Sequence, residues 1–200
     1  MDPIRLPPPR TESAFALERA LDERRTVRSF GVTPLSLQAV GQLLWAAQGV
    51  TTPDGLRTAP SAGALYPLEL TLVAGAVSGL QPGLYRYRPA THALAPLGAG
   101  DRRAALAGAA LNQTWLQQAP ATVVFGAVES RTRFKYGGRS TRYVHIEVGH
   151  AAQNLLLQAR ALGLGAGLIG AFDDAKVAEV LGMPEEEEPL YLVPVGSEGP

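Results

Sequence analysis

The 200-residue chain contains no cysteine, which excludes disulfide bonds, thiolate-bound zinc or iron–sulfur centres and a cysteine nucleophile. It has only three histidines, and their positions match no metal-ligand spacing, so we predict no metal site. Eighteen basic residues balance eighteen acidic ones, so the net charge gives no general attraction to nucleic acid or an anionic membrane. We therefore expect no nucleic-acid partner.

The sequence also lacks an apolar run of transmembrane length, and its polar, proline-rich start, MDPIRLPPPR, does not read as a signal peptide. We therefore expect no membrane partner and a cytoplasmic location. Hydrophobic residues make up 46% of the chain, which is enough to bury the core of one domain. Residues 1–12 are expected to form an extended arm and residues 13–200 a single domain.

Helix and strand patterns are mixed without the regular βαβ order of a parallel sheet, which favours an α+β fold. The expected helices cover 13–25 with Ser13 as N-cap, 33–49 with Gly49 as stop, 101–119, 146–165 and 173–183. The expected strands cover 68–75, the hairpin 83–97, 121–129, 165–173 and 188–196. The helix over 146–165 is apolar on most sides, so we expect it to be central and buried.

Positive charge is concentrated in RRTVRSF, where three arginines, Arg24, Arg25 and Arg28, fall within five positions. In an extended segment, Thr26 and Arg28 point to the same side. Guanidinium groups bind phosphate bidentately, and the threonine hydroxyl adds a neutral donor. The alternative is a solvated helix end, where basic side chains also interact favourably with the C-terminal carbonyls. Taken alone, the segment favours this alternative.

Two glycine-rich or small-residue segments could approach a ligand closely. The loop PSAGALYP, residues 60–67, has few side chains between its backbone and a flat ligand, although the loop taken alone favours an ordinary turn before a strand. The turn at Gly170–Ala171 could present a backbone N–H group to a ligand atom. The glycines before it follow a helix and precede a strand, which is the reverse of a dinucleotide-binding fingerprint.

The pair Lys135–Tyr136 lies in a basic run, SRTRFKYGGRSTRY. Neighbouring cations lower the pKa of a lysine or a tyrosine, and both changes suit proton transfer. The alternative is a solvated basic loop. On the apolar helix that follows, His150 is expected to be a hydrogen-bonded core residue rather than a ligand.

The order of these segments resembles the FMN-dependent nitroreductase superfamily and, within it, the SagB-type dehydrogenases. The resemblance extends from about Leu21 to Gly196. It is carried by these segments: RRTVRSF, PSAGALYP, GLYRYRPATHALAPL, KYGGRSTRYVHIEVGHAAQNLLLQARALGLG, GAFDD and YLVPVG. It implies a nitroreductase-like fold with a mainly antiparallel sheet flanked by helices, and a homodimer with two FMN sites at its interface.

The resemblance also assigns roles to individual residues. Arg24 and Thr26 are expected to hold the FMN phosphate, and Arg28 to lie near N1 and O2 of the ring. The remaining expected contacts are Pro60, Ser61 and Ala62 from the second subunit, Asn112 at the pyrimidine edge, and Gly170 and Ala171 facing N5. Many relatives have a basic C-terminal tail on the phosphate; here that contact is expected to be missing or to be replaced by Arg25 or Arg142.

Two positions depart from the pattern of the superfamily. Trp115 stands where relatives have a lysine beside the pyrimidine ring, so Arg28 is expected to act there alone. Ala64 replaces an asparagine in the loop of residues 60–67, as is common in the SagB-type branch.

Two reactions remain open, and both transfer two electrons through flavin N5. In one, an azoline ring of a modified peptide is oxidised to an azole, with Lys135 and Tyr136 abstracting a proton. In the other, NAD(P)H reduces a small molecule such as a nitroaromatic compound or a quinone. The alternatives outside enzymology are a flavin-binding or storage protein without turnover and, from the residues alone, a phosphate-binding regulatory module.

Overall fold

The computed structural model describes residues 2–199. Within these residues the chain forms a seven-stranded sheet in the order β1-β6-β5-β3-β7-β9-β8, and every neighbouring pair is antiparallel. Its strands are β1 (Ile4–Arg5), β3 (Leu68–Ala74), β5 (Gly83–Arg88), β6 (Ala93–Ala99), β7 (Ala121–Ala127), β8 (Gly165–Ala166) and β9 (Glu188–Gly196). Two short strands, β2 (Leu35–Ser36) and β4 (Val77–Ser78), pair in parallel beside it.

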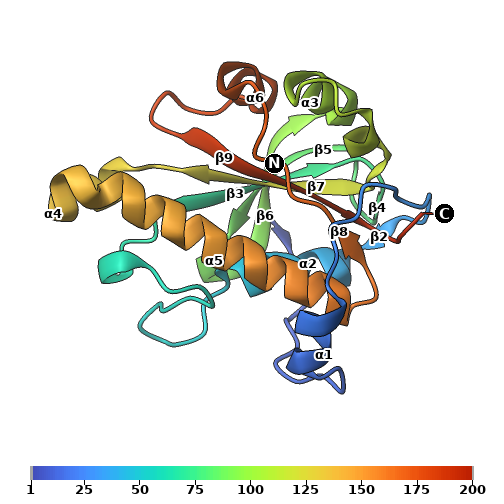
Figure 1. The fold of residues 1–200 in the computed structure, drawn as a ribbon, viewed down its shortest axis with the longest axis horizontal. Coiled ribbons are helices and arrows are strands. Elements are labelled where there is room, and N and C mark those ends of the chain that lie inside the picture. The colour runs from blue at the N-terminus through green and yellow to red at the C-terminus, as the bar shows by residue number, and fades with distance from the viewer. Residues whose placement is uncertain (1, 200) are drawn as a thin grey trace.

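Helices cover both faces of the sheet, with α2 and α5 on one face and α3 and α6 on the other (Figure 1). The helices are α1 (Leu17–Glu23), α2 (Leu37–Gln48), α3 (Arg103–Ala109), α4 (Ser130–Tyr136), α5 (Ser140–Ala161) and α6 (Asp174–Leu181). Short 3₁₀ turns occupy Ala62–Ala64, Pro89–Thr91, Thr114–Gln118 and Gly137–Arg139. The predicted α+β fold with a mainly antiparallel sheet is confirmed.

The sheet separates two hydrophobic cores, because successive side chains of a strand point to opposite faces. In β7, all of whose residues are buried, Val123 and Phe125 join the core beneath α2 and α5. Val124, between them, joins the core beneath α3 and α6. β7, which the sequence predicts as a buried strand, therefore contributes side chains to both hydrophobic cores.

Two helices begin later than expected. α2 begins at Leu37 instead of Thr33, after Ser36, whose hydroxyl accepts a hydrogen bond from the Ala39 N–H; its end before Gly49 is where the sequence predicts it. The expectation that Ser13 caps the first helix is wrong, because α1 begins only at Leu17. The Ser13 hydroxyl instead accepts a hydrogen bond from the Phe15 N–H, which stabilises a local turn rather than a helix start.

The helix expected over 101–119 is interrupted. α3 ends at Ala109, and Leu111 and Asn112 adopt left-handed backbone angles, with φ of 55° and 58°. Left-handed residues end a helix, so one continuous helix is the wrong prediction. The strand expected over 165–173 shrinks to β8, and the basic run at 130–136 forms the helix α4.

The long helix α5 crosses the middle of one face of the sheet (Figure 1). One side of it, with Ala151 and Leu155, is fully buried, whereas Ile146 on the other side is 49% exposed in the single chain. His150 also lies on this exposed side, so its expected place in the core is wrong for one chain. Among residues 2–199, no helix combines enough length with enough apolar character to cross a lipid bilayer.

The N-terminal segment packs onto the domain at the edge of the sheet. Ile4 and Arg5 form β1 and pair with β6, and the buried Leu6 donates its N–H to the His92 carbonyl (3.0 Å). The segment is therefore extended, and it continues the sheet.

Candidate functional site

The arginine segment runs beside β8. The Arg24 N–H donates to the Ala20 carbonyl and closes α1 (3.0 Å), after which the chain becomes extended. Thr26 then forms a parallel bridge with Ala166, and the Val27 N–H donates to the Ala166 carbonyl (2.9 Å). This pairing fixes the segment from Thr26 onward along the edge of the sheet.

The three arginines of this segment differ in their partners. The Arg25 guanidinium donates to the carbonyls of Asp22 (2.7 Å) and Arg24 (2.9 Å), which is the helix-end role that the sequence left open. Within residues 2–199, the half-buried Arg24 and the exposed Arg28 form no side-chain hydrogen bond or ion pair. Two neighbouring cations are thus left available to an anion.

Gly167 permits close packing next to this segment. A Cβ atom there would stand 2.6 Å from the Val27 carbonyl oxygen and 3.1 Å from the Trp115 ring, so a larger residue would displace the segment. Trp115 stacks on Phe30, with ring centroids 6.3 Å apart. Trp115, where the resemblance implies a lysine in relatives, is therefore part of an aromatic pair in this chain.

Asn112 and the Gly170–Ala171 turn are brought together by the break after α3. The Gln113 side-chain amide donates to the Ala171 carbonyl (3.1 Å), and the Asp173 N–H donates to the Ala109 carbonyl (2.9 Å). Asn112 and the turn are exposed. Together with the arginine segment and Trp115, they form what we call the β8 group, at the end of α5 that leads into β8.

The second group lies at the start of α5, where the loop of residues 60–67 meets α4. Gly63 has a left-handed φ of 64°, and a Cβ atom there would stand 2.9 Å from both Lys135 Nζ and Tyr136 Oη. The Ser61 hydroxyl accepts a hydrogen bond from the Tyr66 N–H (2.9 Å), which closes the loop. We call Pro60–Ala64 with Lys135 and Tyr136 the α4 group.

α4 is anchored on both sides. Glu129 accepts hydrogen bonds from Ser140, Thr141 (2.8 Å) and Arg133 (2.9 Å), and these bonds, Ser140 first, lower its pKa to about 2. Arg131 donates to the Tyr66 carbonyl (3.2 Å) and to Glu69 (2.6 Å). The helix that carries Lys135 and Tyr136 is thus fixed to α5, to the loop and to β3, so the pair lies at the end of a helix and not in a loop, with Lys135 exposed and Tyr136 half-buried.

Sequence reasoning missed a buried acid beneath this loop. Glu147, on α5, is 2% exposed, and Ser61, Arg57 and Gln48 surround it. Burial raises its pKa to about 7, and these three neighbours partly oppose the rise. One feature of the sequence could have identified it: Glu147 is the single acidic residue in residues 143–159, a stretch that is otherwise uncharged.

The two groups lie at opposite ends of α5, with α4 at the left and β8 at the right of Figure 1. A helix of 22 residues is about 33 Å long at 1.5 Å per residue. That distance is about the diameter of a small domain. One mononucleotide-sized ligand therefore does not contact both groups within a single chain.

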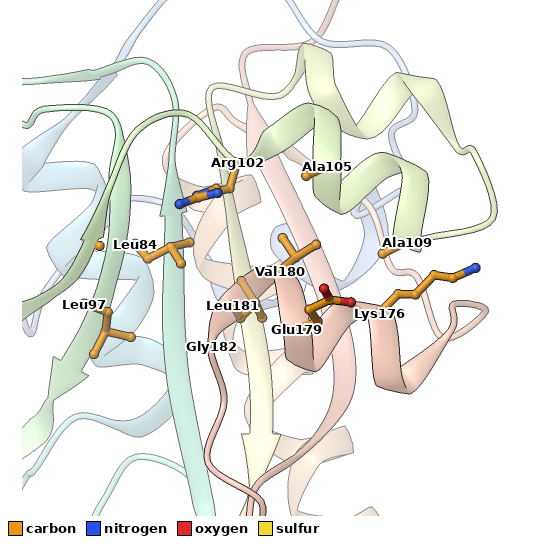
Figure 2. Close-up of a pocket in the computed structure, with 11 residues that line it drawn as sticks. Leu84, Leu97, Arg102, Ala105, Ala109, Lys176, Glu179, Val180, Leu181 and Gly182 are labelled. Carbon is orange, nitrogen blue, oxygen red and sulfur yellow. The ribbon is translucent and has the colours of Figure 1, made fainter.

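A further cleft lies elsewhere. It has a volume of about 570 Å³ and lies between the β5–β6 hairpin, α3 and α6, on the opposite face of the sheet from α5. Figure 2 shows apolar side chains such as Leu84 and Val180 in it, with Arg102 and Lys176 near its margins. None of the site residues predicted from the sequence lines this cleft.

Comparison with known proteins gives consistent matches over nearly the whole chain. The sequence model of the nitroreductase family matches residues 21–197. A nitroreductase homologue of Methanocaldococcus jannaschii is 43% identical over 180 residues, which cover 90% of each chain. The microcin B17-processing protein McbC of Escherichia coli is 28% identical over 157 residues, which cover 74% of this chain but 57% of McbC.

Solved structures extend the comparison to the fold. A nitroreductase-like protein of Ralstonia eutropha has a TM-score of 0.86 and 30% identity, over 99% of this chain and 90% of its own. The NADPH:FMN oxidoreductase of Vibrio harveyi has a TM-score of 0.67 and 22% identity, over 92% and 69% of the two chains. The predicted nitroreductase-like fold is confirmed.

Proposed function

We propose a function for this chain on one premise: it belongs to the nitroreductase family, whose members are oxidoreductases. The proposal is an FMN-dependent oxidoreductase, similar to the SagB-type dehydrogenases, that acts as a homodimer. The McbC relative supports this branch, although the chain spans only 57% of McbC.

The residues of the β8 group fit FMN. Arg24 and Arg28 have no side-chain partner within residues 2–199, and free guanidinium groups suit a phosphate dianion and the electron-rich end of a flavin ring. The exposed Asn112 offers an amide donor and acceptor to a pyrimidine edge. The exposed Gly170–Ala171 turn leaves room for a planar ring beside its backbone.

The separation of the two groups supports a homodimer. A two-fold axis pairs the same surface on both protomers, so the α4 group of one chain can face the β8 group of its partner. Two equivalent sites would result. FMN bound between two chains would also stabilise the assembly, because it binds the dimer and not the separate chains.

The contact of Gly63 with Lys135 and Tyr136 carries the catalytic part of the proposal. It places the predicted proton-transfer pair against the loop predicted to reach FMN. When bound, FMN supplies a two-electron acceptor or donor. Arg28 offsets the negative charge of its reduced state, and Lys135 with Tyr136 takes the proton that an azoline ring loses on oxidation to an azole.

The second candidate is reduction of a nitroaromatic compound or a quinone by NAD(P)H. It is favoured by the 43% identity with a nitroreductase homologue that is matched over 90% of its length, without additional regions. It needs no protein base, because solvent can protonate an exposed reduced product.

Absorbance of the purified protein tests the proposal. We expect a flavin spectrum, a dimer by light scattering, and bleaching under anaerobic conditions by NADH, NADPH or an azoline peptide. A protein that binds no FMN would contradict the whole proposal. A protein that binds FMN but is reduced by none of these donors would be a flavin-binding or storage protein instead.

A further inference from the structure

Four charged side chains form a continuous series of ion pairs from the interior of the sheet to α4. Arg86 on β5 donates two hydrogen bonds to Glu187, just before β9, over 2.9 and 2.7 Å. Arg86 also donates to Glu69 on β3 (3.3 Å), and Glu69 accepts a bond from Arg131 on α4 (2.6 Å). The exposed fraction of the side chains rises from 3% at Glu187 to 42% at Arg131, so this ion series leads from the core to the surface.

Stability alone does not account for the ion series. A buried ion pair adds little stability compared with packed apolar side chains, because the cost of removing both charges from water offsets their attraction. The backbone is nevertheless shaped to admit it, since a Cβ atom at Gly126 on β7 would collide with the Glu187 carboxylate. What the ion series provides is a fixed position and orientation for its exposed end, the Arg131 guanidinium.

The same guanidinium holds Tyr66, the last residue of the Ser61–Tyr66 turn. Arg131 donates to the Tyr66 carbonyl over 3.2 Å. The Tyr66 N–H donates to the Ser61 hydroxyl (2.9 Å), and the Tyr66 hydroxyl accepts the Arg57 N–H (3.1 Å). The Arg57 guanidinium also lies 4.4 Å from the centre of the Tyr66 ring. All three polar groups of Tyr66 are thus bonded.

The turn needs such anchors, because its backbone is strained. Gly63, Ala64 and Tyr66 have left-handed φ angles of 64°, 55° and 46°. Glycine adopts this region readily, but the region is unfavourable for residues with a Cβ atom and rare for a bulky one such as tyrosine. Loss of the bond from Arg131 removes one of the contacts that hold Tyr66 in this region, so the turn should open more often.

The turn and α4 meet at two places that are about one helical turn apart. Arg131, near the start of the helix, bonds the Tyr66 carbonyl. Lys135 and Tyr136, at its end, lie next to Gly63, because a Cβ atom there would stand 2.9 Å from Lys135 Nζ and from Tyr136 Oη. Movement of the turn at Tyr66 therefore changes the position of Gly63 relative to the pair.

We propose that Arg131 is a positioning residue, which fixes the Ser61–Tyr66 turn to α4 and thereby places the turn against the proposed proton-transfer pair. Glu69 orients the Arg131 guanidinium for this role. The consequence for catalysis rests on the proposed function. The effect on the turn does not, because hydrogen bonds within the chain carry it.

Hydrogen exchange of the Ala64 and Tyr66 amides tests the effect on the turn, with the full chain as purified and at one pH. Arg131→Gln removes the charge-assisted bond to the Tyr66 carbonyl, so we expect protection of both amides to fall about tenfold. Arg133→Gln is the matched control. It removes an arginine from the same helix, but the hydrogen bond of Arg133 goes to Glu129 rather than to the turn, so protection should be unchanged. Unchanged protection in Arg131→Gln, or an equal loss in the control, would overturn the proposal.

A double variant tests the role of Glu69. Glu69→Gln weakens the hold on the Arg131 guanidinium, so protection should fall by a smaller factor than in Arg131→Gln. Combining the two substitutions should cause no further loss, because Glu69 acts through Arg131. Losses that multiply in the double variant would show that Glu69 does not act through Arg131.

Turnover tests the consequence for catalysis. With FMN bound, kcat for azoline oxidation should fall about tenfold in Arg131→Gln, while substrate KM and FMN affinity stay unchanged. Arg131→Lys keeps the charge but not the forked guanidinium that reaches both the turn and β3, so its kcat should follow its amide protection. A kcat restored by lysine while protection stays low would assign the effect to charge and overturn the catalytic part.

The two proposals can fail separately. If the wild type binds no FMN or oxidises no azoline, the proposed function fails in that form. The amide comparison between Arg131→Gln and Arg133→Gln still decides the role of Arg131, because it requires neither flavin nor substrate.

Discussion

The residues at the two ends of α5 differ in how far contacts within the chain fix them. At the α4 end, hydrogen bonds and ion pairs within the chain fix the Ser61–Tyr66 turn and the helix that carries Lys135 and Tyr136. At the β8 end, the backbone is fixed by pairing with Ala166, but Arg24 and Arg28 have no partner among the described residues. One end is organised by the protein, whereas the other presents charge to an anion.

This comparison separates chemistry from binding. Groups that transfer protons need a fixed geometry before substrate arrives, because misplacement lowers the rate directly. Groups that hold a phosphate need charge, and they can be ordered by the ligand itself. We therefore expect substitutions at the α4 end to change turnover and substitutions at the β8 end to change FMN affinity and potential.

Lys135→Ala should have the largest effect. If azoline oxidation is the activity, loss of the base should lower kcat by about 10²- to 10⁴-fold with FMN fully retained. If nitroaromatic reduction is the activity, the rate should remain nearly unchanged. Lys176→Ala, at the other lysine of the chain, is the matched control. A variant that keeps FMN and loses neither activity would show that Lys135 has no catalytic role.

Arg24→Ala should have the next largest effect, on binding alone. Loss of one charge-assisted phosphate contact costs about 1.5–3 kcal/mol, so FMN affinity should fall about 10- to 150-fold. Arg102→Ala is the control, because Arg102 is exposed at the start of α3. Titration with FMN measures both, and equal affinities in the two variants would remove Arg24 from the phosphate site.

Arg28→Gln should lower the two-electron reduction potential of bound FMN, because the negative charge of the reduced state loses its counter-cation. A change on the order of 30 mV corresponds to about 1.4 kcal/mol. Spectroelectrochemical titration against the wild type measures it. An unchanged or higher potential would place Arg28 away from the ring.

Glu129→Gln should have the smallest effect, on stability. Hydrogen bonds from Ser140, Thr141 and Arg133 lower the pKa of Glu129 from 4.5 to about 2, so its contribution is present above pH 4.5 and lost as the pH falls towards 2. We expect the variant to lose about 1 kcal/mol at neutral pH, a modest value because water screens the carboxylate. Urea unfolding should show this difference disappearing towards pH 2; a difference independent of pH would contradict it.

The sequence by itself determined the local elements whose signals lie within a few residues. The apolar run of β7, the Gly49 stop of α2, and the hairpin of β5 and β6 all form where they are expected. Such elements depend on periodicity and on caps, which are local properties of the chain. The order of the motifs likewise carried the family, which the match over residues 21–197 shows.

Only the tertiary structure decided what depends on distant partners. Ser13 satisfies a turn instead of a helix, and the chain breaks at Leu111–Asn112 where Gln113 reaches Ala171. Glu147 has a raised pKa because the folded chain buries it, and no local pattern encodes that burial. The two candidate groups lie toward opposite ends of α5, which is about 33 Å long, because a helix converts sequence separation into a fixed distance.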